Sequence, residues 1–277
     1  MSPDKLNNST SAQHESLPGA RKALNRTVLL WYFMTAFGQA AFLLFILLFY
    51  YPSALSGNFV AWDDKPNITG FVAGDAVGNI MFALHVIIAA VMTADGLVQL
   101  IPAIRQKWPK LHRWNGRVFV ATALILAIGG LWLVWGRGSY LTLTGAFGIS
   151  LNGFLIIGFA VLAWRAAINK KFAEHRRWAL RLFIVANAVW FMRLGYMIWG
   201  VGTGGLGVGE TMNGPFDYFL AFGNSLVPLA FMELYLRVRA TQSYRAYYAM
   251  AVALALCALL TIGGSAAAWM FMWGPYV

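Results

Sequence analysis

Long apolar runs alternate with short polar segments along almost the whole chain. A run of about 20 apolar residues is long enough to cross the hydrocarbon core of a membrane as a helix. Stretches such as FLLFILLF and VIIAAV are apolar at every position, whereas the strands of a membrane barrel alternate apolar and polar residues. The pattern therefore predicts an all-α, polytopic membrane protein with seven transmembrane helices. We expect these spans at residues 28–50, 79–101, 117–135, 143–164, 178–199, 216–236 and 248–273.

The first 26 residues are polar, in contrast with the apolar run that follows them. That run is too long for a secretory signal peptide and lacks its small-residue cleavage pattern, so we expect it to stay as the first span. The sequence thus predicts a disordered tail over residues 1–26 and a single transmembrane domain over residues 27–277.

The composition agrees with a membrane protein, because 60% of the 277 residues are hydrophobic and 11% are charged, whereas roughly a quarter are charged in soluble domains. The net charge of +11 reflects orientation and not nucleic-acid binding. Of the 21 Lys and Arg residues, 18 lie before the first span or where the second, fourth and sixth spans connect to the next. The positive-inside rule then places the N-terminus inside and the C-terminus outside. The single cysteine, Cys257, excludes an intrachain disulfide.

The third and fifth predicted spans resemble each other at an offset of 64 residues. Trp114 and Arg117 recur as Trp178 and Arg181, and each copy ends in a Trp-Gly pair whose Trp follows the Arg by 18 residues. That spacing corresponds to about 27 Å of helix, close to the hydrocarbon thickness of a bilayer. The second and third spans and the fourth and fifth spans are therefore predicted to form a parallel internal repeat. Such repeats occur in transporters, and paired helices also hold cofactors in four-helix bundles.

One group of motifs resembles an uncharacterised family of bacterial integral-membrane proteins, a domain of unknown function. The motifs are His85, LVQLIP (97–102), PKLHRWNGR (109–117) and EHRRW (174–178). The family is recognised by Pro-x-x-His-Arg-x-x-Gly-Arg after a helix that carries a histidine, and the resemblance covers roughly residues 75–200. It implies a helical membrane fold and a location in the bacterial cytoplasmic (inner) membrane. It implies no particular activity.

A looser resemblance is to the four-helix core of cytochrome b561, in which each helix gives one histidine and each haem lies between alternate helices. Here the second, third and fifth spans carry His85, His112 and His175. The fourth span departs from that pattern, because the repeat places Ile149 opposite His85 and the nearest polar residue is Asn152. The resemblance therefore implies haem b between the third and fifth spans and leaves the second haem of that family without a ligand.

Two histidines are expected at the same depth, at the inner ends of parallel spans, which is the geometry that a bis-histidine haem needs. Arginines beside them would hold the haem propionates. In the alternative interpretation these residues are interfacial: the bases reach lipid phosphates, and each arginine lies over the Trp three residues before it. The candidate haem site comprises His112, His175, Arg113, Arg117, Arg176 and Arg181.

A second set of polar residues lies in the outer halves of four spans. Polar and charged side chains inside a membrane are costly and mark functional sites, so we expect an outward-facing cavity. Its arginine would bind a small anionic or quinone-like guest at a carboxylate or carbonyl; in the alternative interpretation it extends to the outer headgroups. The candidate cavity residues are His85, Asn152, Asn187, Arg193 and Asn224.

A third polar set is expected near the inner face. Asp95 and Gln99 share one helix face at i, i+4, and Glu233 ends the sixth span. The two carboxylates are interpreted as counter-ions of Arg117 and Arg181, or alternatively as members of a proton relay. No metal site is expected, because His85 lies about 20 Å from the inner histidines by helical rise.

Three functions remain open at this point. The first is membrane electron transfer with haem b, and the second is a transporter or receptor for a small guest. The third is a purely structural membrane protein. The expected partners are the lipid bilayer and a small molecule, and nucleic acid is excluded by the charge distribution described above.

Overall fold

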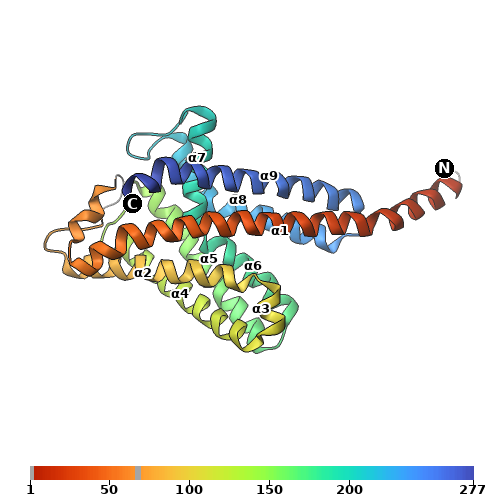
Figure 1. Ribbon diagram of the computed structural model, residues 1–277, viewed down its shortest axis with the longest axis horizontal. Helices are drawn as coiled ribbons and strands as arrows, with labels where there is room; N and C mark the ends of the chain where they lie inside the picture. Colours follow the sequence, from red (N-terminus) through yellow and green to blue (C-terminus); the bar gives the residue numbers. More distant parts are fainter. Residues whose placement is uncertain (1–2, 66–69) are drawn as a thin grey trace.

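The computed structural model describes residues 3–65 and 70–277, with side chains from residue 16 onward, and the described residues form helices without strands (Figure 1). The all-helical prediction is confirmed. Six helices of the described chain are each long and apolar enough to span a membrane, and the number is seven if the bent pair α6 and α7 counts as one span. The inward N-terminus and the internal repeat stay predictions. The α-helices are α1 (Pro3–Ser56), α2 (Ala76–Gln99), α3 (Pro102–Lys107), α4 (Pro109–Trp135), α5 (Leu143–Ile168), α6 (Phe172–Ala186), α7 (Ala188–Thr203), α8 (Pro215–Ala240) and α9 (Tyr244–Ala268).

Three short elements complete the chain. The 3₁₀ helix η1 (Phe59–Asp64) follows α1, the π-helical turn η2 (Trp269–Trp273) continues α9, and η3 (Gly274–Tyr276) ends the chain. These short elements lie together at the end of the bundle that carries the C-terminus, where α1 and α9 end (Figure 1).

Helix α1 begins at Pro3, within the segment expected as a polar tail, and from about Leu17 onward it packs along α9 (Figure 1). Ala20 and Leu24 are fully buried in a cluster with Tyr247 and Met250 of α9. Their spacing of four residues puts both side chains on one helix face. Burial of this short apolar stripe against α9 therefore stabilises a helical segment in which most residues are polar.

Two larger apolar cores lie farther along the bundle. One contains Phe119 of α4, Ile156 of α5 and Phe183 of α6. The other joins α1, α7 and the C-terminal turn through Phe45, Trp190 and Trp273. Because both cores include residues of α2, this helix links the two halves of the bundle.

Helices α5 and α8 approach each other closely at Gly148. A Cβ atom at this position would collide with the backbone carbonyl of Ala221. Small residues permit such close backbone approach in membrane bundles. The contact fixes α8 against the face of α5 that also carries Asn152.

Candidate binding site

The two inner histidines lie at the starts of α4 and α6. The Nδ1 atom of His175 lies 3.0 Å from the carbonyl oxygen of Ala163 in α5, where an Nδ1–H donates a hydrogen bond. The Nδ1 atom of His112 is buried and has no hydrogen-bond partner among the described residues. His175 lies close enough to His112 to act on it electrostatically. The structure therefore brings the two predicted histidines into one region.

The arginines around these histidines are occupied by protein groups or exposed. Arg117 lies over the ring of Trp114, with its Cζ 4.9 Å from the ring centroid, and Arg181 lies over Trp178 at 4.5 Å. The Trp-to-Arg spacing thus produces the same cation–π contact in both helices, as the interfacial interpretation expected. The remaining candidates for propionates, Arg113 and Arg176, are exposed at the helix starts.

The inner carboxylates differ from each other. Glu233 of α8 accepts two hydrogen bonds from Arg181, one of them at 2.8 Å from Nη2, so its predicted counter-ion role is confirmed. Asp95 makes no ion pair with Arg117 or any other described base, and its Oδ2 atom is buried without a partner. Of the two carboxylates interpreted as counter-ions of Arg117 and Arg181, only Glu233 therefore pairs with one of them among the described residues.

The polar residues next to Asp95 connect α2 to α4. Gln99 donates through Nε2 to the carbonyl oxygen of His112 at 2.9 Å, and Asn115 donates to the carbonyl oxygen of Asp95 at 2.9 Å. These reciprocal amide-to-backbone bonds hold the inner ends of the two helices together. Asp95 and Gln99 therefore belong to one helix interface, as their shared face predicted.

The five residues of the predicted outer cavity are divided among several helix interfaces. His85 packs against Gly129 and Gly130 of α4. Asn152 donates to Ser225 at 2.9 Å, and Ser225 donates to Asn224 at 2.8 Å, which links α5 to α8. Because the five positions were grouped by depth alone, the sequence could not separate the helix faces that carry them.

Asn152 and Asn187 have a structural role at a break in the fifth span. Helices α6 and α7 meet at Asn187 with a bend of 53°, which leaves the carbonyls that end α6 without their usual helical donors. Asn187 Nδ2 donates to the carbonyl of Phe183 at 2.8 Å, and Asn152 Nδ2 donates to that of Val185 at 2.8 Å. The two amides therefore satisfy the backbone that the break exposes.

The Arg193 side chain folds back along its own helix and toward α1. Its Nη1 donates to the carbonyl of Val189, one turn back along α7, at 3.0 Å. Its Cζ lies 4.9 Å from the ring centroid of Phe42 in α1. The guanidinium is thus held between its own helix and α1.

Lys65 is a second cation beside Arg193 that the sequence reasoning did not select. It follows η1, is buried, and donates through Nζ to the carbonyl of Met272 at 2.8 Å. Nζ also lies 4.8 Å from the ring centroid of Tyr276. Burial, and then the nearby charge of Arg193, lower the pKa of Lys65 to about 8. The sequence feature that could have identified Lys65 is its position in a loop on the predicted outer side, where the loops contain few bases.

Five buried aromatic residues join the two cations and form what we call the outer aromatic cluster. Phe42, which contacts Arg193, stacks near Trp273 at 5.2 Å, and Phe45, 5.7 Å from Lys65 Nζ, lies 6.3 Å from the same indole. The indole N–H groups of Trp62 and Trp273 are buried without acceptors in the described part of the chain. The cluster comprises Phe42, Phe45, Tyr50, Trp62 and Trp273.

This region contains two cations and buried N–H donors, and no carboxylate pairs with either cation among the described residues. Among the described residues, neither Lys65 nor Arg193 forms an ion pair. Asp63, two residues before Lys65, accepts hydrogen bonds from the backbone of Gly70 and Phe71. Cations and N–H donors are therefore concentrated without an acidic acceptor. Such an arrangement favours an anion or a carbonyl oxygen on a flat apolar molecule.

Comparison with known proteins identifies one family. A family model described as Predicted membrane protein (DUF2306) matches residues 82–236, which include His85, both inner histidines and the break at Asn187. Comparisons with curated proteins and with solved structures gave no match.

Proposed function

Because the chain belongs to this family of predicted membrane proteins, we propose that it is a transporter or receptor that binds a small anionic or quinone-like molecule. The site is the outer aromatic cluster with Lys65 and Arg193. With the orientation that the loop charges predict, the cluster faces the outside of a bacterial cytoplasmic membrane. The observation that carries the proposal is the pair of cations in one aromatic cluster, without an ion pair among the described residues.

A bound guest would supply the negative charge or carbonyl oxygen that the protein side chains of this site lack. Two like charges in a region of low dielectric are unfavourable without a counter-charge. A carboxylate would accept from the guanidinium fork of Arg193 and from the ammonium of Lys65. A flat ring would pack against Phe42 or Trp273 by offset or edge-on stacking. A quinone offers the same combination, with carbonyl oxygens in place of the carboxylate.

Binding of a matched pair of probes tests the proposal. We expect 2-naphthoate to quench the tryptophan fluorescence of the detergent-purified protein saturably and more tightly than neutral 2-naphthamide. Replacing Arg193→Gln should weaken 2-naphthoate binding about tenfold or more, the value of a charged hydrogen bond, and leave 2-naphthamide nearly unchanged. Arg245→Gln is the control, because this arginine is exposed in the first turn of α9. Equal affinity of wild type for both probes, or saturable binding of neither, would contradict the proposal.

Haem-dependent electron transfer is the second candidate function, and one observation favours it. The Nδ1 atom of His175 bonds to a backbone carbonyl, which leaves Nε2 as the ligand nitrogen, as in many haem and metal sites. An absorption spectrum of protein purified from haem-producing cells tests this function. A Soret band lost in His175→Ala and kept in His85→Ala would support it, and wild-type protein without the band would contradict it.

A further inference from the structure

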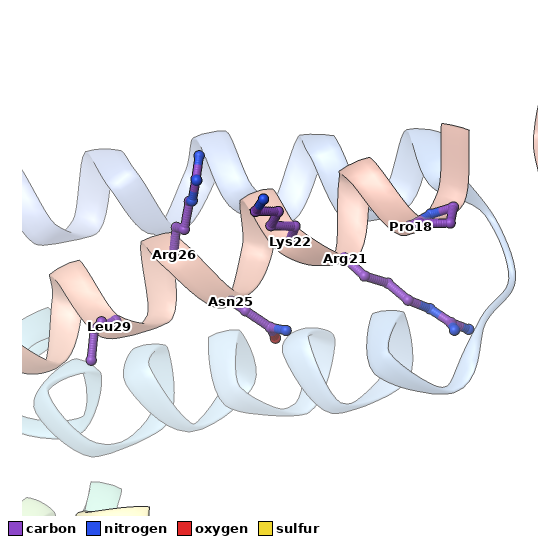
Figure 2. A pocket seen from close by; sticks show the side chains of 6 residues that line it. All are labelled: Pro18, Arg21, Lys22, Asn25, Arg26 and Leu29. Atoms are coloured by element: carbon purple, nitrogen blue, oxygen red, sulfur yellow. The ribbon is translucent and has the colours of Figure 1, made fainter. Parts of the chain in front are cut away.

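A basic groove lies on α1 at the end of the bundle opposite the outer aromatic cluster. It has a volume of about 560 Å³ (Figure 2). Four of its residues are polar or charged and form two pairs at a spacing of four residues, Arg21 with Asn25 and Lys22 with Arg26, so each pair lies on one face of α1. We call it the headgroup groove; it is lined by Pro18, Arg21, Lys22, Asn25, Arg26 and Leu29.

The hydrogen-bond partners of two arginines at the groove are neutral side chains. Arg21 donates to the amide oxygen of Gln242 at 2.8 Å, and Arg239 of α8 donates to that of Asn25 at 2.8 Å. Both partners are neutral amides, so these bonds position the guanidinium groups without neutralising them. Figure 2 shows Arg21 and Asn25 extending to one side of α1 and Arg26 to the other.

Two further bases are exposed in the same groove. Lys22 and Arg26 lie one turn apart and form no ion pair among the residues whose side chains are described. Together with Arg21 and Arg239 they concentrate positive charge within about two helical turns. A phosphate group, with several acceptor oxygens, matches this arrangement.

An apolar stripe continues from the groove along α1. Leu29 closes the groove, and Phe33 and Phe37 follow at intervals of four residues, with relative exposures of 54%, 57% and 65%. The stripe is about 12 Å long by helical rise. A cationic groove followed by an exposed apolar stripe matches an amphiphile with a phosphate head and a hydrocarbon chain. We propose that the headgroup groove binds one anionic phospholipid of the adjoining leaflet.

Native mass spectrometry of the full chain in detergent tests this site. Dioleoyl-phosphatidylglycerol and dioleoyl-phosphatidylcholine are offered in equal amounts, and we expect the wild type to retain the anionic lipid preferentially. The double variant Lys22→Gln, Arg26→Gln should lose about thirtyfold in retention, from roughly fivefold for each base near a phosphate surface. Equal retention of the two lipids by the wild type would overturn the proposal, whatever the variants do.

A matched variant and a soluble competitor complete the experiment. Lys170→Gln with Arg177→Gln removes two exposed bases around the start of α6 and should leave retention unchanged. An equal loss in this control would show a general charge effect and overturn the site. Glycerol 3-phosphate should fail to displace the lipid at equal concentration. Displacement would indicate a site for a soluble phosphate and would also overturn the lipid assignment. Neither result depends on the proposed guest at the outer aromatic cluster.

Discussion

Gln39 of α1 donates through Nε2 to the Oδ1 atom of Asn187 over 2.9 Å, and both side chains are buried. This bond joins the longest helix of the bundle to the residue at which the fifth span bends. Asn187 uses its other amide atom to cap the carbonyl of Phe183. One asparagine therefore holds the bend from inside and ties it to a neighbouring helix.

Asn187→Ala should lower the free energy of unfolding by about 1 to 3 kcal/mol, because it leaves buried polar groups unpaired. The measurement is denaturant unfolding in detergent, with Asn169→Ala, at the exposed end of α5, as the control. The double variant Gln39→Ala, Asn187→Ala should show a coupling of about 1 kcal/mol. Additive effects of the two single changes would mean that the bond does not contribute.

Gly148→Ala should destabilise the protein by about 1 to 3 kcal/mol, because the new methyl group collides with the backbone of α8. The same helix offers a matched control at Gly158, which is exposed and has open space around a Cβ. Gly158→Ala should be neutral or slightly stabilising, since alanine favours helix over glycine. Equal melting temperatures of the two variants would show that α5 and α8 are not in this close contact.

The affinity for 2-naphthoate should fall as the pH rises through about 8, the pKa of Lys65. The sign follows from charge: the anion binds the ammonium form, so binding raises the pKa of Lys65 and weakens when the proton is lost. Lys65→Arg should remove this pH dependence, because a guanidinium stays charged in this range. A wild-type profile as flat as that of the arginine variant would exclude Lys65 from the binding site.

Reporter fusions test the orientation. A reporter after Val277 should read as periplasmic, and one inserted in the loop at 169–171 should read as cytoplasmic, because 18 of 21 bases lie on the predicted inner side. The opposite pair of readings would place the headgroup groove in the outer leaflet and the outer aromatic cluster inside.

The transmembrane spans could be predicted because an apolar run of membrane length is a local property of the chain. The break in the fifth span could not be predicted, since neither proline nor glycine marks Asn187. The pairing of Arg181 with Glu233 was predictable from depth, because both lie near the expected inner face. Contacts between segments that lie far apart in the sequence could not be predicted in this way. Arg137, for example, donates hydrogen bonds to Asp75 at 2.8 Å and to Asn79 at 2.7 Å, about 60 residues earlier in the chain.

The residues of the candidate site could likewise be predicted only in part from the sequence. Sequence reasoning selected Arg193, because a charge within an apolar span stands out, and predicted an anionic or quinone-like guest beside it. It grouped Asn152 and Asn187 with that arginine because residue counting gives depth and not the direction of a side chain around the helix. It missed Lys65, whose role exists only because the C-terminal turn brings Met272 and Tyr276 to it.

Helix α1 contains Pro18 and Pro52 and no proline between them. The intervening segment is about 50 Å long by helical rise, and without a proline it has no built-in hinge. Its inner end carries Lys22 and Arg26, and its outer end carries Phe42 and Phe45. One continuous helix therefore joins the headgroup groove to Phe42, the ring that contacts Arg193.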